Sequence, residues 1–327
     1  MTARHVPRTD GPPDHLSEPA SIRAARAALP IDAIHEEVRA ALAAAVPALA
    51  GYVDALPPKV FGVESGFFHL PVAQALLWGL PADEWLRGLG TAVALGSVHY
   101  AAQDIVVDTG DCTTELVLVC DAAQTAYLRQ LHRLCPDEKC ARHHDRYFER
   151  YCAALIADRR HRDAVIPFGA EDVLRLADKA APLFLGFPLA MARTPHGGPP
   201  LSDVERALRH LCVGLQLHDD VADIAEDLAQ GYFSFPATVT LLRRMGHPPG
   251  PVRPGLDHAE VEARMYLDGV AAASYELATR HFEHGAVVAA SAGVQAVADL
   301  ADHWRARTGA RLRHVEESAK WAAEYGR

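Results

Sequence analysis

Five carboxylates stand within nine residues in the segment D-D-V-A-D-I-A-E-D, which runs from Asp219 to Asp227. No Lys or Arg occurs between His210 and Leu242 to neutralise them. On a helix, which turns by roughly 100° per residue, these acids fall within an arc of about 120° and leave the opposite side apolar. Like charges at this spacing repel, and hard divalent cations prefer carboxylate oxygens. The pattern predicts a magnesium-binding helix face, whereas the commonest alternative is a solvated acidic face. The candidate ligands are Asp219, Asp220, Asp223 and Asp227.

A second acidic pair lies upstream in Q-D-I-V-V-D, where Asp104 and Asp108 are one helical turn apart. This stretch also lacks a base, because no Lys or Arg occurs between Arg87 and Arg129. The apolar residues between the two acids indicate a largely buried helix, in which unpaired carboxylates are costly. We expect the two acidic faces to converge across a bundle and to hold several Mg²⁺ ions. Such ions keep positions open for phosphate oxygens, so a polyphosphate is the predicted ligand.

Helices must position these acids, because Ala, Leu, Glu and Arg dominate the chain and apolar positions recur three and four residues apart. The 327 residues are half hydrophobic, which is ample for one core. The predicted fold class is all-α, a single-domain bundle of about ten or more helices. Residues 1–25 are predicted to be a disordered tail and residues 26–327 the helical domain. The predicted helices lie near residues 31–55, 69–79, 82–109, 114–135, 138–160, 170–193, 201–229, 234–245, 258–284 and 296–323.

Charge and hydropathy exclude several classes of function. A formal net charge of −10 argues against a nucleic-acid surface, which would need basic stripes. The first residues lack the apolar region of a signal peptide, and no run of about 18 apolar residues occurs, so we predict a cytoplasmic protein without a membrane span. The six cysteines are scattered and predicted to be reduced. The run C-P-D-E-K-C-A-R-H-H, with Cys152 as a further ligand, fits no standard zinc site.

The segment L-Q-L-H-D-D-V-A-D-I-A-E-D-L-A-Q-G-Y-F-S-F-P resembles the second aspartate-rich motif of trans-isoprenyl diphosphate synthases and class I terpene synthases. Three features carry the resemblance: Gln216 three residues before the Asp pair, the spacing Asp219-Asp220-x-x-Asp223, and Asp227-Leu228-x-x-Gly231 followed by Ser234 and Pro236. Asp104-x-x-x-Asp108 is similar to the outer members of the first motif, D-D-x-x-D, although Ile105 stands in its second position. The stretch L-A-D-K-A-A-P-L-F is similar to K-T-x-x-L-F, whose lysine binds diphosphate. The resemblance covers about residues 50–245.

This resemblance implies a helical bundle of the isoprenoid synthase type around a central cavity. It implies an allylic prenyl diphosphate substrate, Mg²⁺ as the cofactor, about three ions in number, and it allows a homodimer. Lys179, with Arg175 one turn earlier, would bind the diphosphate, and Gln216 would flank it. Tyr100, Phe184 and Phe187 would line an apolar pocket in which ring faces stabilise a carbocation. Because Tyr100 lies one turn before Asp104, it would obstruct a long prenyl tail, which favours a substrate of ten or fifteen carbons.

The chain departs from the synthases where they bind a second diphosphate. Lys59 is the one base in the expected N-terminal stretch, no arginine follows Asp108 in T-G-D-C-T-T-E-L, and Tyr232 replaces the lysine of G-K-x-[ST]. Charge-assisted contacts contribute about 1.5–3 kcal/mol each to binding. Their loss would therefore strongly weaken the binding of a small dianionic co-substrate. We therefore favour a terpene synthase that ionises the diphosphate and then cyclises, deprotonates or hydrates the cation.

Three alternatives stay open at this point. A trans-prenyl diphosphate synthase or other prenyltransferase would condense the allylic diphosphate with a second substrate. A non-catalytic helical metal-binding protein would keep the acidic helix without the reaction. A di-iron carboxylate protein is disfavoured, because such proteins pair Glu-x-x-His repeats and the chain contains no such repeat.

Overall fold

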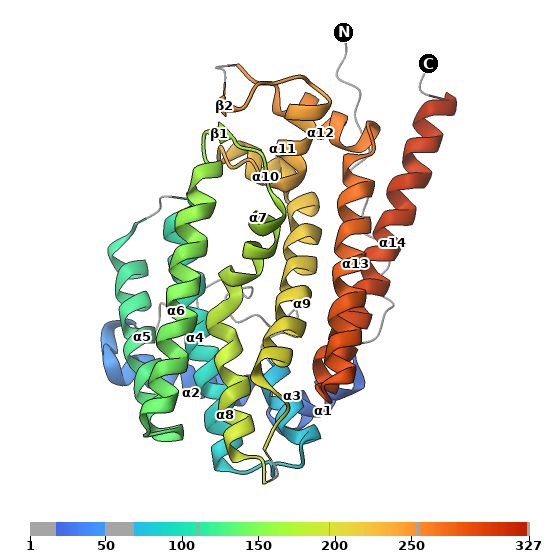
Figure 1. The fold of residues 1–327 in the computed structure, drawn as a ribbon. Coiled ribbons are helices and arrows are strands. Elements are labelled where there is room, and N and C mark those ends of the chain that lie inside the picture. The colour runs from blue at the N-terminus through green and yellow to red at the C-terminus, as the bar shows by residue number, and fades with distance from the viewer. Residues whose placement is uncertain (1–17, 50–68, 110–111, 196, 253–254, 326–327) are drawn as a thin grey trace.

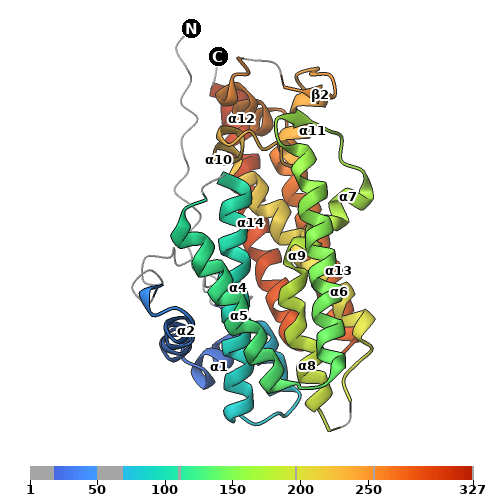
Figure 2. The ribbon, with the colours of Figure 1, turned by 90° about the vertical axis from the view of Figure 1, so that its left-hand side faces the viewer.

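The computed structural model describes residues 18–49, 69–109, 112–195, 197–252 and 255–325, and in these ranges the chain is almost entirely helical. Most of the long helices run side by side, parallel or antiparallel, as Figures 1 and 2 show. The all-α prediction is confirmed. The elements are α1 (Ala20–Ala28), α2 (Ile31–Ala45), η1 (Pro47–Leu49), α3 (Leu70–Leu77), α4 (Glu84–Thr109), α5 (Thr114–Leu134), α6 (Glu138–Asp158), η5 (Arg159–His161), β1 (Ala164–Val165), α7 (Ala170–Arg175), η6 (Leu176–Leu185), α8 (Gly186–Arg193), α9 (Leu201–Ala222), α10 (Ile224–Ala229), α11 (Phe235–Arg243), β2 (Gly250–Pro251), α12 (His258–Leu267), α13 (Val270–Ser291) and α14 (Gln295–Tyr325).

The predicted N-terminal tail is partly wrong. Helix α1 begins at Ala20, and it buries Ile22 and Ala25 completely in the main hydrophobic core. Apolar side chains at i and i+3 on a short helix are enough to dock it, although the segment is rich in polar residues and Pro. Residues 1–17 lie outside the described residues, as do residues 50–55 of the helix predicted at 31–55, and the described part of that helix ends at Ala45.

Three predicted helices are interrupted, and the interruptions matter for the site. The segment predicted as one helix at 201–229 consists of α9 and α10, which are separated at Asp223 by a residue with φ −98° and ψ 10°. The segment predicted at 170–193 contains the 3₁₀-helix η6, with Pro182 inside it, because proline removes a backbone donor and crowds the preceding turn. The predicted helix at 258–284 divides at Gly269, whose φ of 78° is left-handed.

The C-terminal ends of α4, α6 and α9 lie at the same end of the bundle, the upper end in Figure 1. The antiparallel pair β1–β2 and α10–α12 lie over this end. Backbone hydrogen bonds join residues 161–163 to 231–233, from Asp163 N to Gly231 O (2.8 Å) and from Phe233 N to His161 O (2.9 Å). The loop that follows the acidic segment is therefore fixed to the segment that follows α6.

Helices α9, α13 and α14 pack closely side by side through the bundle. Gly214 on α9 makes this approach possible, because a Cβ atom there would lie 2.6–2.8 Å from the ring of Phe282 on α13. Phe282 is fully buried, so its ring has no open space into which to move. Within the described residues no helix is both long enough and apolar enough to cross a membrane.

We predict that Gly214→Ala destabilises the protein by about 1–3 kcal/mol, the usual cost of overpacking a well-packed core. Urea unfolding followed by circular dichroism would measure the change. Gly309→Ala is the matched control, since Gly309 lies inside α14 and its added methyl group would meet nothing closer than the end of the Arg313 side chain, at 3.7 Å. Helix propensity should make that variant neutral or slightly more stable. Equal destabilisation by both substitutions would contradict the packing argument.

Candidate active site

The acidic segment at the end of α9 forms a two-sided cluster. The side chains of Asp219 and Asp223 reach solvent, whereas Asp220 is 2% exposed and Asp227 is half-buried. Gln216, one turn earlier, donates from Nε2 to Asp220 Oδ1 at 2.7 Å. The other oxygen of this carboxylate, Oδ2, is buried and accepts no well-formed hydrogen bond within the described part of the chain, although the backbone N–H of Phe235 is near enough to the carboxylate to lower its pKa. Burying a carboxylate oxygen without a hydrogen-bond donor is unfavourable, and a cation bound beside it would offset that cost.

Burial and mutual repulsion raise the pKa of three of these carboxyl groups. Burial raises the pKa of Asp220 to about 6. Burial, followed by the charge of Asp220, raises the pKa of Asp227 to about 8. Burial and then the charges of Asp223 and Asp220 raise the pKa of Asp219 to about 7.

Lys179 is the cation of this cluster. It lies in η6, and its positive charge lowers the pKa of both Asp220 and Asp227 against the effect of burial. Its ammonium is 2.9 Å from Asp158 Oδ2 at the end of α6. Tyr232 Oη donates to Asp158 Oδ1 at 2.7 Å, and Lys179 Nζ lies 5.5 Å from the centre of the Tyr232 ring. The structure thus brings Lys179 together with the acidic segment, and it adds Asp158, which sequence reasoning missed.

Arg307 on α14 is a second residue that sequence reasoning missed. Its positive charge lowers the pKa of Asp219 against the effect of burial, so it lies near the solvent-facing side of the cluster. The guanidinium also lies 5.0 Å from the centre of the Trp304 ring. No pattern in the sequence links Arg307 to the acidic segment, because the contact depends on how α14 packs against α9.

The first acidic pair lies on the last turns of α4. Asp104 is half-buried, and its Oδ1 accepts a hydrogen bond from Tyr151 Oη on α6 at 3.1 Å. Asp108 belongs to α4, but its side chain lies outside the described residues. Since the C-terminal ends of α4 and α9 lie at the same end of the bundle (Figures 1 and 2), the two motifs share that end. A joint metal site between them stays a prediction.

The residues present fit a divalent cation at the α9 motif. Three carboxyl groups have raised pKa values, and one buried carboxylate oxygen accepts no well-formed hydrogen bond within the described residues. Among the side chains that the structure describes, no three His, Cys, Asp or Glu groups are arranged to hold a metal ion by themselves. An ion here would complete its coordination with water or ligand oxygens, which is the usual behaviour of Mg²⁺. Glu226, on the same predicted arc, is exposed and accepts a hydrogen bond from Gln230 Nε2 at 3.3 Å.

An apolar pocket lies beneath Tyr100, between α4, α5, η6 and α8. Its cavity volume is only about 10 Å³, so the side chains that line it nearly fill it. Tyr100 packs edge-on against Tyr151, with ring centres 4.9 Å apart, and against Tyr127 at 6.4 Å. This tyrosine cluster, Tyr100, Tyr127 and Tyr151, separates the pocket from Asp104. The pocket is lined by Leu89, Ala92, Val93, Gly96, Tyr100, Tyr127, Leu131, Pro182, Leu183, Leu185, Gly186 and Leu189.

Phe184 and Phe187 do not line this pocket, contrary to the sequence-based expectation. Phe184 is fully buried on another side of η6, where its ring meets Tyr147 at 6.0 Å and Arg150 Cζ at 5.6 Å. Phe187 is buried in the core. The 3₁₀ geometry of η6 is the reason, because its tighter turn rotates each side chain relative to the α-helix that the sequence predicted.

Arg175 is engaged in an ion pair within α7. Its Nη1 lies 3.1 Å from Asp172 Oδ1, three residues earlier, and its guanidinium lines a side pocket together with Arg160 and Lys179. A role for Arg175 in diphosphate binding stays a prediction.

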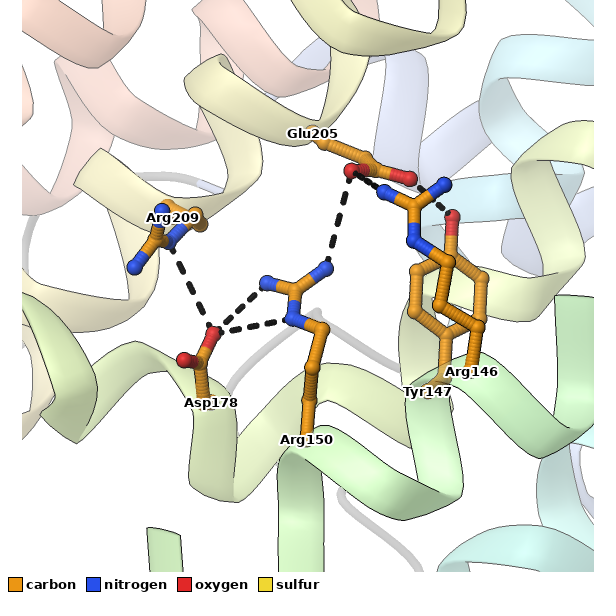
Figure 3. A network of polar contacts seen from close by, with 6 residues as sticks. All are labelled: Arg146, Tyr147, Arg150, Asp178, Glu205 and Arg209. Atoms are coloured by element: carbon orange, nitrogen blue, oxygen red, sulfur yellow. Dashed lines mark hydrogen bonds and ion pairs between the residues drawn. The ribbon is translucent and has the colours of Figure 1, made fainter. Parts of the chain in front are cut away.

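A network of ion pairs around the shielded carboxylates of Asp178 and Glu205 fixes η6 to α6 and α9 (Figure 3). Arg150 lies 2.6 Å from Asp178 and 3.6 Å from Glu205, and Arg209 approaches Asp178 at 3.6 Å. Tyr147 Oη donates to Glu205 at 2.7 Å, and Arg146 pairs with the same carboxylate. Through Asp178 this network fastens η6 to both helices, whereas Lys179 pairs separately with Asp158.

The raised pKa values predict how stability depends on pH. Each of the three carboxyl groups binds its proton more tightly in the folded protein than in the unfolded chain, where the pKa is near 3.8. The unfolded state therefore loses protons first as the pH rises, and these groups destabilise the metal-free fold progressively between about pH 4 and pH 8. We expect the Tm without metal to fall across this range. Scanning calorimetry would show a shallower fall for Asp227→Asn, and an unchanged slope in that variant would contradict the assignment.

No family model matches the chain, and no curated protein matches its sequence. Solved structures match its fold. A polyprenyl synthase from Caulobacter crescentus CB15, complexed with calcium and isoprenyl diphosphate, has a TM-score of 0.67 at 17% identity, covering 91% of this chain and 99% of that one. A geranylgeranyl pyrophosphate synthetase from the archaeon Geoglobus acetivorans has a TM-score of 0.66 at 14% identity, covering 88% and 99%. A geranylgeranyl pyrophosphate synthase from Corynebacterium glutamicum has a TM-score of 0.65 at 17% identity, covering 89% and 93%.

The chain therefore has the isoprenoid synthase fold, and the resemblance drawn from its aspartate motifs is confirmed at the level of the fold. Its similarity extends over nearly the whole length of trans-prenyl diphosphate synthases.

Proposed function

We propose that this protein is a magnesium-dependent enzyme that acts on an allylic prenyl diphosphate. The observation that carries the proposal is the position of Lys179 beside the under-compensated carboxylates of Asp220 and Asp227. A cation next to acids with raised pKa values suits a ligand that brings both negative phosphate oxygens and divalent metal ions. The fold supports the same proposal, since solved structures similar to this chain include a polyprenyl synthase with calcium and isoprenyl diphosphate.

In this proposal Asp219, Asp220, Asp223 and Asp227, with Asp104 and Asp108, would hold Mg²⁺ directly or through water. When bound, Mg²⁺ supplies Lewis-acid stabilisation of the charge on a departing diphosphate. Gln216 orients the Asp220 carboxylate through its 2.7 Å hydrogen bond. Lys179 contributes a positive charge that favours the diphosphate as its bond to the allylic carbon breaks. The tyrosine cluster and the pocket below it would exclude water from the hydrocarbon tail.

Transfer of the prenyl group to a second substrate, as in a trans-prenyl diphosphate synthase, is now the favoured reaction. The similar structures named above are synthases, and this is the observation that favours condensation over the cyclisation that the sequence suggested. Cyclisation stays the second candidate because of one specific feature. Tyr232 stands where the synthases carry a lysine, and its phenol is engaged by Asp158 rather than offering a positive charge.

Incubation with geranyl, farnesyl and geranylgeranyl diphosphate, each with and without isopentenyl diphosphate, would test the proposal. Longer prenyl diphosphates formed only with isopentenyl diphosphate would establish condensation. Hydrocarbons or alcohols formed from the allylic diphosphate alone would establish cyclisation or hydration. Failure of every substrate to release diphosphate in the presence of Mg²⁺ would refute the proposed function and leave the non-catalytic metal-binding protein.

We predict that Tyr100→Ala shifts the preference toward longer prenyl chains. The ring is 7% exposed and stands at the top of the apolar pocket, so its removal would open the way into the space below. Competition between farnesyl and geranylgeranyl diphosphate would measure the shift, which should be at least about tenfold, because one or two methylene contacts contribute about 1–3 kcal/mol. Phe187→Ala is the control, since Phe187 is buried but does not line the pocket. An equal shift in both variants would contradict the proposed role of the pocket.

A further inference from the structure

Lys179 carries the one lysine charge acting on Asp220 and Asp227 in the described residues, and that charge is shared with Asp158. The Lys179 side chain is 22% exposed and the Asp158 side chain 11% exposed, so the 2.9 Å ion pair is largely shielded from water. Such a pair is strongly held once formed, because losing one partner leaves the other charge buried without compensation.

The Asp158 carboxylate has a second partner besides Lys179, the hydroxyl of Tyr232. Tyr232 donates to Asp158 Oδ1 while Lys179 meets Oδ2, so each carboxylate oxygen has one partner. Tyr232 is 7% exposed, and its backbone is tied to the segment after α6 by the bonds between residues 161–163 and 231–233. Gly231 permits this turn, since its φ is 70° and a Cβ there would lie 2.8 Å from Asp163 Oδ1. The position of the Asp158 carboxylate is therefore set by the fold.

The alternative partners of Lys179 are the acids of the proposed metal site. Its charge already acts on Asp220 and Asp227, and Asp158 acts on Asp220 as well. If the ion pair with Asp158 were lost, Asp220 and Asp227, on which the lysine charge already acts, would be alternative partners for the shielded ammonium. The lysine would then compete with the metal ions for the same oxygens.

We propose that Asp158, oriented by Tyr232, is a positioning residue that holds the Lys179 ammonium away from the Asp220 and Asp227 carboxylates. The oxygens of these two carboxylates then stay available to Mg²⁺, and the ammonium stays available to the diphosphate. The inference rests on the proposed function. In this proposal Tyr232, which stands where the synthases carry a lysine, orients the Asp158 carboxylate and does not supply a positive charge.

The test is a double-mutant cycle read out by binding rather than by turnover. Calorimetric titration of inorganic diphosphate at a series of Mg²⁺ concentrations would be carried out on the unmodified protein, Asp158→Asn, Lys179→Ala and the double variant. We expect Asp158→Asn to raise the Mg²⁺ concentration needed for half-maximal diphosphate binding by about fivefold or more, in line with coupling between contacting charges. In the Lys179→Ala background the same substitution should raise it by less than about twofold. Tyr232→Phe should act in the same direction as Asp158→Asn, more weakly, and again only with Lys179 present.

Asp178→Asn is the matched control. Asp178 is adjacent to Lys179 and is similarly shielded, at 14% exposure, but it pairs with Arg150, which lies about two turns before Asp158 on α6 (Figure 3). It should lower the Tm by an amount comparable to that of Asp158→Asn and leave the Mg²⁺ requirement unchanged. The inference is overturned if Asp158→Asn raises the requirement equally with and without Lys179, or if Asp178→Asn raises it as much. Absence of Mg²⁺-dependent diphosphate binding in the unmodified protein would instead refute the proposed function.

Discussion

Asp219→Asn is expected to lower the rate of diphosphate release from an allylic prenyl diphosphate by at least about 100-fold. Asp219 faces the solvent side of the cluster, where its carboxylate has Asp223 and Asp220 as negative neighbours and Arg307 as a nearby cation. Replacing the carboxylate by an amide keeps the shape and removes the charge that would hold a metal ion. Metal ions contribute several kcal/mol to stabilising charge in such transition states, and each 1.36 kcal/mol is about tenfold in rate. Release of inorganic diphosphate in a coupled assay would measure the loss.

Glu226→Gln provides a control within the same run of acids. The sequence places Glu226 on the same arc as Asp219, but the structure shows it exposed and hydrogen-bonded to Gln230. We expect this variant to retain the activity of the unmodified protein within about twofold, as for an exposed polar substitution. If both substitutions reduced the rate equally, the acidic run would act through its overall charge, and the assignment of individual ligands would be wrong.

Lys179→Ala is expected to reduce the same rate by about 10- to 100-fold, because charge-assisted contacts contribute about 1.5–3 kcal/mol. The side chain is shielded and its charge acts on two carboxylates of the site, so its effect should fall mainly on the step in which charge develops on the diphosphate. Measuring kcat and KM separately would show a lower kcat as well as a weaker apparent affinity. Substitution by Arg should restore part of the activity, since it returns the positive charge.

Lys139→Ala is the control for loss of a lysine. Lys139 is exposed in the first turn of α6, at the end of the bundle opposite to Asp158. Its removal changes the net charge by the same amount as Lys179→Ala, and we expect no change in kcat. A similar loss of activity in both variants would mean that the long-range potential, and not the contact, explains the effect.

The aspartate motifs could be located from the sequence because their chemistry is local. Acids at i, i+1, i+4 and i+8 with no base for many residues on either side are visible without a structure, and so are Gln216 one turn earlier and Lys179 in its short motif. Helical periodicity likewise predicted most helix positions, with α4, α5 and α6 within two residues at each end. These features depend on neighbours within one or two turns, and the sequence lists such neighbours directly.

The ends and interruptions of helices were less predictable. The break at Asp223, the 3₁₀ course of η6 and the early start of α1 all follow from how these segments pack against others. The wrong placement of Phe184 is a direct consequence, since a change of helix type rotates every side chain after it.

The sequence alone determined that this chain is a helical protein with an acidic segment that lacks neighbouring bases, and it located a separate lysine motif around Lys179. Only the tertiary structure decided which charges meet. Asp158 and Lys179 come from separate helices, Tyr232 from a loop fixed by backbone hydrogen bonds, and Arg307 from the C-terminal helix. Coulomb interactions act over a few ångströms in space, whatever the separation along the chain, so contacts between distant segments appear only once the helices are packed.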